Sequence, residues 1–402
     1  MKIEVDYRFP VGIDPERQAK VIALGQTVGT WDASFAHREA SFHKHQGEVA
    51  QVERQDDGTA IATVRFPTIN VEGDIASLLT MIFGKYSMAG PAKVVDVRLP
   101  EDYGQRAKFG ISGVRSRLGV LDRPLVMAIF KPALGLSAAD HAQILGEVAG
   151  AGLDVIKDDE ILGNLESAPT LERLRACLPV LDAAQQRTGK PLLYAVNVTG
   201  RADQLLAQAK RLIEAGANAL LLNVLTYGFS VLEALAQDPE ITVPIFAHPA
   251  LAGALCGAPD HGFSYGVLLG TLMAHAGADA VLYPAHYGSL PFSAAEERHI
   301  RDALRDRNVF PVPSAGIHPG IVPKAIADYG IDVILNAGTG IMDHPDGAAA
   351  GVQAFFEALN VEAQKAKAQN ANAQSQTQPG QPFDLDQIPP GPLRRALEKW
   401  GT

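Results

Sequence analysis

The stretch LVMAIFKPALGLSAADHAQILGEVAGAGLDVIKDDE, residues 125–160, has the pattern of one strand–helix–strand unit. It begins and ends with short apolar runs typical of buried parallel strands, and the Ala-rich segment between them is long enough for a crossover helix. Six further runs follow at similar spacing: LLYAVNV (192–198), ALLLNV (219–224), PIFAHPA (244–250), AVLYPAH (280–286), VFPVPSAG (309–316) and DVILNAGTG (332–340). Eight units predict a closed (β/α)8 barrel, or TIM barrel, and an open doubly wound sheet is the alternative.

The barrel pattern covers residues 116–362, and a different pattern precedes it. Residues 1–115 mix alternating segments such as IEVDYRF (3–9) with helix-like segments such as DIASLLTMIFGKY (74–86). Runs of strands combined with separate helices are typical of a two-layer arrangement. We therefore expect a small N-terminal α+β domain of the ferredoxin-like type.

The composition changes again after the barrel, over residues 363–402. QKAKAQNANAQSQTQPGQP (364–382) is poor in apolar residues, which indicates a flexible tail or a fraying helix end. The last segment, IPPGPLRRALEKWGT (388–402), predicts a short amphipathic helix. We expect this helix to dock on the barrel or on a neighbouring subunit.

The composition excludes several classes of partner. The 402 residues are 47% hydrophobic and carry a formal net charge of -10, so neither a nucleic acid nor an anionic membrane is an expected partner. A small phosphorylated substrate is compatible, because a few cations and helix N-termini suffice to bind one phosphate. Two cysteines, no signal-peptide pattern and no long apolar run indicate a cytoplasmic protein.

Polar residues follow each predicted strand, at the end where barrel enzymes place their chemistry. After the second strand comes Lys157-Asp158-Asp159-Glu160. Strand alternation directs Lys157 and Asp159 toward a common centre, and Glu160, which follows where the strand ends, is a further candidate for the same centre. Two carboxylates suit Mg2+, and Lys157 would add a third anionic oxygen if CO2 converted its amine to a carbamate. The sequence thus predicts a magnesium site at Lys157, Asp159 and Glu160.

Lys131, after the first strand, is a candidate for proton transfer next to a carbonyl. Lys131 and Lys157 are therefore the two predicted catalytic residues. His248 ends the fifth strand and is a predicted substrate-binding residue. Tyr283 and His286 belong to the expected sixth loop, whose Gly and Pro content suits a lid, and His286 is also predicted to bind substrate.

Small residues follow the last two strands, where barrel enzymes commonly bind phosphate through backbone N–H groups. Ser314 is a predicted substrate-binding residue, and Gly316, Gly338 and Thr339 are predicted phosphate-binding residues. Each glycine turn alone is a weak signal, but both stand at the expected positions.

Four motifs in this order, KPALGLS (131–137), GLDVIKDDE (152–160), SAGIHPG (314–320) and NAGTGIMDHPDG (336–347), resemble the large subunit of RuBisCO and the RuBisCO-like proteins. The resemblance covers about residues 1–360, since GTW (29–31) and FGKYSM (83–88) extend it into the N-terminal domain.

The resemblance implies roles for several positions. Lys157 matches a carbamylated lysine, Asp159 and Glu160 match metal carboxylates, and Lys131 matches a proton-transfer lysine. Thr30 and Trp31 would complete the phosphate site of a partner subunit, which implies a homodimer with a shared active site.

Departures from the carboxylase pattern matter equally. Ala133 and Pro249 stand where carboxylases have a lysine and an arginine, and Gly25 and Met81 stand where they have Glu and Asn. The sixth loop, HYGSLPFS (286–293), has no lysine to polarise CO2. We therefore expect no carboxylase activity.

The remaining chemistry predicts an enzyme, a metal-dependent lyase or an enolase/isomerase, that forms an enediolate from a phosphorylated keto sugar acid. A 3-oxo-isoapionate-4-phosphate decarboxylase is the preferred hypothesis. A 2,3-diketo-5-methylthiopentyl-1-phosphate enolase or methylthioribulose-1-phosphate isomerase of methionine salvage is the first alternative. A non-enzymatic metabolite-sensing protein is the second.

Overall fold

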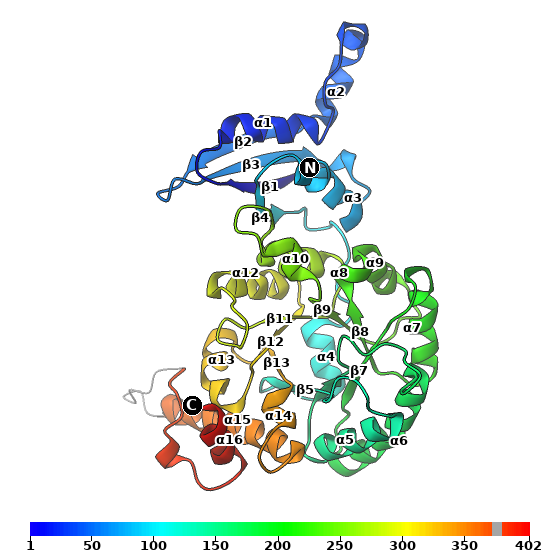
Figure 1. Cartoon of the computed structure of the whole chain (residues 1–402), viewed down its shortest axis with the longest axis vertical. Helices are drawn as coiled ribbons and strands as arrows, with labels where there is room; N and C mark the ends of the chain where they lie inside the picture. The colour runs from blue at the N-terminus through cyan, green and yellow to red at the C-terminus, as the bar shows by residue number, and fades with distance from the viewer. Residues whose placement is uncertain (372–379) are drawn as a thin grey trace.

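A computed structural model of the chain describes residues 1–371 and 380–402, and its larger part is a closed barrel (Figure 1). Hydrogen bonds join eight parallel strands in the order β12-β11-β9-β8-β7-β6-β5-β13, and contacts between β12 and β13 close the ring. The strands are β5 (Leu125–Ile129), β6 (Val155–Lys157), β7 (Leu193–Asn197), β8 (Ala219–Asn223), β9 (Ile245–His248), β11 (Ala280–Pro284), β12 (Phe310–Ser314) and β13 (Ile334–Ala337). The predicted barrel and its eight strands are confirmed.

Helices surround the barrel because each strand is buried on both faces and needs cover on its outer side. They are α5 (Ala138–Gly150), α6 (Thr170–Thr188), α7 (Leu205–Glu214), α8 (Val224–Tyr227), α9 (Phe229–Gln237), α10 (Ala252–Cys256), η6 (Gly266–Leu272), α11 (Met273–His275), α12 (Ala294–Arg305), α13 (Val322–Tyr329), α14 (Thr339–Met342) and α15 (Ala348–Ala371). Inside the barrel, side chains from all eight strands form one apolar cluster, which α4 (Gly110–Leu118) joins through Val114 and Leu118. This packed interior leaves only the rim of the barrel for chemistry.

The N-terminal domain has the ferredoxin-like order predicted for it. Its strands β1 (Lys2–Phe9), β2 (Glu48–Arg54), β3 (Ala60–Pro67) and β4 (Lys93–Arg98) lie in the order β4-β1-β3-β2, and β10 (Gly262–Phe263) of the barrel part pairs with β4. Strands β1 and β3 alternate buried and half-buried residues, since one face packs under α1 (Pro15–Gly25) and α3 (Ile75–Leu79). The segment made of η1 (Ala33–Arg38) and α2 (Glu39–His45) buries no residue and projects away from the barrel (Figure 1).

The C-terminal region packs against the barrel. Helix α15 crosses the boundary expected at residue 362 and continues to Ala371, and part of the predicted flexible tail, residues 372–379, lies outside the described residues. The predicted terminal helix is α16 (Pro392–Trp400), which contacts α15 and buries Leu393 and Leu397. Among the described residues, none of the helices has the length and apolar character required to cross a membrane.

Candidate active site

The loop after β6 forms the centre of the candidate site. Lys157, the last residue of β6, is buried, and its Nζ donates to the carbonyl oxygen of Asp158 at 3.0 Å and to Oε2 of Glu160 at 3.3 Å. Burial lowers the pKa of Lys157 below its usual value, because removal from water penalises the ammonium form, although Glu160 and Asp159 oppose this shift. A buried lysine with a lowered pKa has more neutral amine, the form that reacts with CO2.

A second lysine meets the same loop from β5. The Nζ of Lys131 lies 2.6 Å from Oδ2 of Asp159, whose side chain is almost fully buried. On the other side of Lys131 is the turn after β13, since a Cβ atom built on Gly338 would lie 3.7 Å from the Cε of Lys131. Lys131 therefore lies between Asp159, in the loop after β6, and the predicted phosphate-binding turn at Gly338, after β13.

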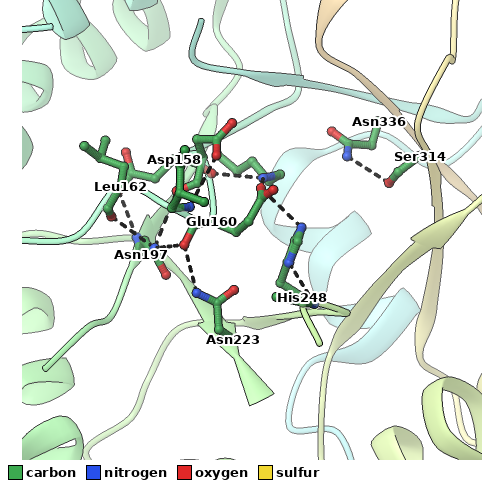
Figure 2. Close-up of polar contacts among 12 residues, drawn as sticks. Asp158, Glu160, Leu162, Asn197, Asn223, His248, Ser314 and Asn336 are labelled. Atoms are coloured by element: carbon green, nitrogen blue, oxygen red, sulfur yellow. Dashed lines mark hydrogen bonds and ion pairs between the residues drawn. The ribbon is translucent and has the colours of Figure 1, made fainter. Parts of the chain in front are cut away.

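His248 contributes from β9 on the other side of Glu160. Its Nε2 lies 3.3 Å from Oε2 of Glu160 (Figure 2). Burial and the neighbouring charge of Lys157 lower the pKa of His248 to about 4. Burial would raise the pKa of Glu160, but its interactions with the neighbouring His248 and Lys157 side chains outweigh burial and hold it below the usual value. The structure thus brings Lys131, Lys157, Asp159, Glu160 and His248 together, as the sequence predicted.

Asp158 points away from these groups and anchors the loop. Its Oδ1 accepts hydrogen bonds from the Tyr194 hydroxyl at 2.6 Å and from Nε of Arg173 at 3.1 Å. Its Oδ2 accepts from Nη2 of Arg173 and from the backbone N–H of Asn197, both at 2.9 Å. The side chains of Arg173 and Asp158 are both fully buried. It fixes the backbone between Lys157 and Asp159.

Two asparagines at strand ends hold the other half of the loop. Nδ2 of Asn197 donates to the carbonyl oxygens of Glu160 and Leu162, both at 3.1 Å, and Nδ2 of Asn223 donates to that of Glu160 at 2.9 Å (Figure 2). Backbone carbonyls need such donors where a strand has ended. The position of Glu160 is thus set by side chains from β7 and β8.

The turns after β12 and β13 lie next to each other, because a Cβ atom built on Gly340 would collide with the carbonyl oxygen of Ile317. Ser314 accepts a hydrogen bond at 2.9 Å from Nδ2 of Asn336, a residue of β13 that the sequence analysis did not single out (Figure 2). Gly316 has φ +99°, and a Cβ there would meet the backbone nitrogen of Ser289 at 2.6 Å, so the turn needs glycine. Asn336 could have been noticed as the one polar residue inside the apolar run VILNA.

Other predicted residues lie apart from this cluster. Nδ1 of His286 lies 2.6 Å from Oε2 of Glu297 on α12. Tyr283 was wrongly assigned to the sixth loop, because it is a buried residue of β11 whose hydroxyl lies 3.1 Å from that of Tyr329.

Thr30 and Trp31 lie in the N-terminal domain, just before the projecting segment η1–α2. Thr30 is exposed, and the Trp31 ring packs 5.1 Å from the ring of Phe42 on α2. This segment points away from the barrel of its own chain (Figure 1). The two residues therefore do not belong to the cluster around Lys157 of the same chain.

The donor set suits a divalent cation. No group of three or more His, Cys, Asp or Glu side chains in residues 1–371 and 380–402 is arranged to hold a metal, so Asp159 and Glu160 need a further ligand. A carbamate on Lys157 would be that ligand. It would also give a hard-oxygen set of the kind that Mg2+ prefers. The residues therefore fit the predicted cofactor.

The fold and the site define a (β/α)8-barrel protein with an acidic, lysine-containing loop at its mouth and a ferredoxin-like domain in front. Residues 110–290 and 297–385 match the family model "Ribulose bisphosphate carboxylase large chain, catalytic domain". This chain belongs to the RuBisCO large-chain family, as its motifs predicted.

Three similar proteins refine this result. A 2,3-diketo-5-methylthiopentyl-1-phosphate enolase of Microcystis aeruginosa (strain NIES-843 / IAM M-2473) is 64% identical over 401 residues, with both chains covered completely. The crystal structure of a RuBisCO-like protein (MtnW) from Alicyclobacillus acidocaldarius has a TM-score of 0.87 at 39% identity and also covers both chains completely. The dimeric archaeal RuBisCO from Hyperthermus butylicus has a TM-score of 0.86 at 27% identity, over 100% of this chain and 96% of that one.

These relatives place the chain among the enzymes of the RuBisCO-like branch rather than among the carboxylases, in agreement with Ala133, Pro249 and the lysine-free sixth loop. They favour the enolase, which the sequence analysis gave as its first alternative. They do not support the preferred decarboxylase.

Proposed function

We propose that this chain enolises 2,3-diketo-5-methylthiopentyl-1-phosphate. The observation that carries the proposal is the cluster in which Lys131 meets Asp159, and Lys157 and His248 meet Glu160, at the mouth of a barrel that matches the enolase of Microcystis aeruginosa over its full length. Enolisation moves a proton from a carbon next to a keto group to the keto oxygen. The site must therefore bind the phosphate, accept a proton and stabilise the negative charge that develops on oxygen.

The residues of the cluster can divide these tasks. The turns after β12 and β13, with Gly316, Gly338 and Thr339, are proposed to hold the phosphate through backbone N–H groups. Lys131 lies beside Gly338 and is accessible from the mouth, with 42% of its side chain exposed. We assign proton transfer to Lys131, with a bound water as the alternative. His248 and Ser314 are proposed to orient the substrate, and His286, held by Glu297, is proposed to contact it from the sixth loop.

The proposed cofactor is Mg2+, held by Asp159, Glu160 and a carbamate on Lys157. When bound, the ion supplies positive charge that stabilises the developing enolate. The chain prepares this site itself, because Asp158 and Asn197 fix the loop and burial keeps Lys157 reactive toward CO2.

The proposed assembly is a homodimer with shared active sites. Thr30 and Trp31 lie directly before the segment η1–α2, which projects from the N-terminal domain and buries none of its residues within its own chain. In a dimer, these residues would lie over the mouth of the barrel of the partner subunit. Trp31 would then contribute to the phosphate site of the partner subunit.

The proposal is tested by measuring enolisation of the diketone itself. Purified protein with Mg2+ and bicarbonate should form the conjugated enol, seen by ultraviolet absorbance, and should exchange the substrate proton in D2O. Lys131→Met should lower the rate by about 100-fold or more, as expected for loss of a proton-transfer group. Lys20→Met, on the exposed face of α1, serves as the matched control and should leave the rate unchanged. Release of CO2 from phosphorylated 3-oxo acid sugars, with no enol from the diketone, would overturn the proposal in favour of the decarboxylase.

A further inference from the structure

The C-terminal helix α16, red in Figure 1, lies beside the chain that continues from both predicted phosphate-binding turns. The turn after β12 leads to His318 and then to η7 (Pro319–Ile321), which contacts α16. The turn after β13 leads through α14 to His344. The ring of Trp400, the last residue of α16, has its centroid 6.4 Å from that of His318 and 6.2 Å from that of His344. One side chain of α16 is thus close to both turns.

Both ends of α16 contact these same parts of the chain. A Cβ atom built on Gly320 would collide with the carbonyl oxygen of Gly401, the residue after the helix. At the other end, Nε2 of His344 lies 3.0 Å from the carbonyl oxygen of Pro392, the first residue of α16. Nδ1 of His344 accepts from the backbone N–H of Asp346 at 3.1 Å, so the ring carries its proton on Nε2 and donates it to Pro392. Helix α16 therefore has a defined position relative to the two turns.

The turn after β12 depends on its surroundings for its shape. Ala315 has φ +65°, a value that is unfavourable for a residue with a Cβ atom, and Gly316 follows with φ +99°. Such a backbone persists where neighbouring contacts hold it. The N–H of Ser289 donates to the carbonyl oxygen of Ala315 at 2.7 Å, and a Cβ atom on Gly340 of the next turn would lie 3.0 Å from Cα of His318. A shift of His318 would therefore disturb both turns.

We propose that Trp400 is a positioning residue for the phosphate group of the substrate. This inference rests on the proposed function, which assigns the phosphate to Gly316, Gly338 and Thr339. Backbone N–H groups bind a phosphate only when they converge on it. Trp400 does not touch the phosphate, but it holds the chain that follows both turns and so keeps their N–H groups in register. The match to the family model ends at residue 385, before α16 begins, so this support comes from outside the catalytic domain that the model describes.

The steady-state kinetics of enolisation by the full chain test this role. Trp400→Ala should raise KM about tenfold, the size expected for the loss of one hydrogen bond to a charged group. It should leave kcat nearly unchanged, because Lys131 and Lys157 belong to β5 and β6, at other strands of the barrel. Trp400→Phe should restore KM, since a phenyl ring can still pack beside the two histidines. Glu398→Ala is the matched control, because Glu398 lies on the exposed face of α16 and pairs with Arg394, and its KM should equal that of the unmodified chain.

KM does not depend on the fraction of folded chain, whereas the apparent kcat does, so the two constants separate positioning from stability. An unchanged KM in Trp400→Ala would overturn the proposal, and so would a fall in kcat alone, which is the result of a purely structural role. An equal rise in KM for Glu398→Ala would overturn it as well. If the unmodified chain forms no enol, the proposed function fails, and isothermal titration with inorganic phosphate tests the positioning role by itself. Binding about tenfold weaker in Trp400→Ala would then support that role, and equal affinity would overturn it.

Discussion

Replacement of Arg173 by Met should remove the support of the active-site loop. Arg173 is fully buried, and its guanidinium group makes four hydrogen bonds: two to Asp158, one to the Tyr194 hydroxyl and one to the carbonyl of Ala168. The charge of Asp158 outweighs burial and raises the pKa of Arg173 above its usual value. Met has a similar length but no charge, so the variant leaves the carboxylate of Asp158 buried with only two donors.

The expected cost is large. Removal of one partner from a buried ion pair typically destabilises a protein by about 3–5 kcal/mol, because the other charge stays buried without compensation. A stable domain has only about 5–15 kcal/mol in total, so Arg173→Met should lower the midpoint of urea unfolding strongly. Enolisation by the folded fraction should also fall, since Asp158 fixes the backbone between Lys157 and Asp159.

The double variant Arg173→Met/Asp158→Asn isolates the electrostatic part. Asn is neutral and can still accept from Tyr194, so the double variant should be more stable than Arg173→Met alone. The assay is urea unfolding at one fixed protein concentration, which keeps any dimer contribution constant. A loss below about 1 kcal/mol in Arg173→Met, the size expected of an exposed pair, would refute the reasoning. A double variant no more stable than Arg173→Met would refute it as well.

Three further predictions concern other parts of the chain. Inactive Trp31→Ala and inactive Lys157→Ala proteins, mixed and reassociated, should regain about one quarter of the activity if a C2 dimer shares its sites, and no recovery would contradict the shared site. Burial raises the pKa of Glu233, which accepts a hydrogen bond from the Ile75 N–H, to about 7. The folded state therefore binds this proton more tightly than the unfolded chain, and the free energy of unfolding should fall by about 1 kcal/mol as the pH rises from 6 to 8. Urea unfolding should show this loss in the unmodified protein and not in Glu233→Gln. Gly316→Ala should weaken substrate binding, measured as a higher KM, because its positive φ and close backbone contact exclude a Cβ; an unchanged KM would show that the turn adapts.

The strands and the mouth residues could be predicted because they follow local rules. The eight apolar runs are short and buried on both faces, and the residue after each run must lie at the same rim of a parallel barrel. This rule is sufficient to bring Lys131, Lys157, Glu160 and His248 together, although they are distant in the sequence. Strand β2, by contrast, is an exposed edge strand with no clear alternation, so its sequence gives a weak signal.

The support of the site could not be predicted in the same way. The contact between Asp158 and Arg173 depends on the rotation of α6 about its axis, which the apolar pattern of that helix does not fix to the accuracy of a hydrogen bond. Tyr194 and Asn197 reach Asp158 from the neighbouring strand, in a register that the sequence does not contain. Tyr283 was misplaced for a related reason: the strand β11 extends to Pro284, and a proline at a strand end resembles the start of a loop.

Pro249 supports the proposed substrate, which carries one phosphate. A ribulose bisphosphate carries a phosphate at each end, and a site for it needs cations or phosphate-binding turns at both ends of the substrate. In this chain the turns after β12 and β13 remain, with Gly316 and Gly338 in place, but on the side of β9 Pro249 stands where the carboxylases have an arginine. An apolar end of a substrate would lose free energy beside a buried cation, whereas it loses none beside a proline. The replacement therefore suits a substrate with one phosphate and one uncharged thioether end, which is the composition of the diketone that the relatives' name specifies.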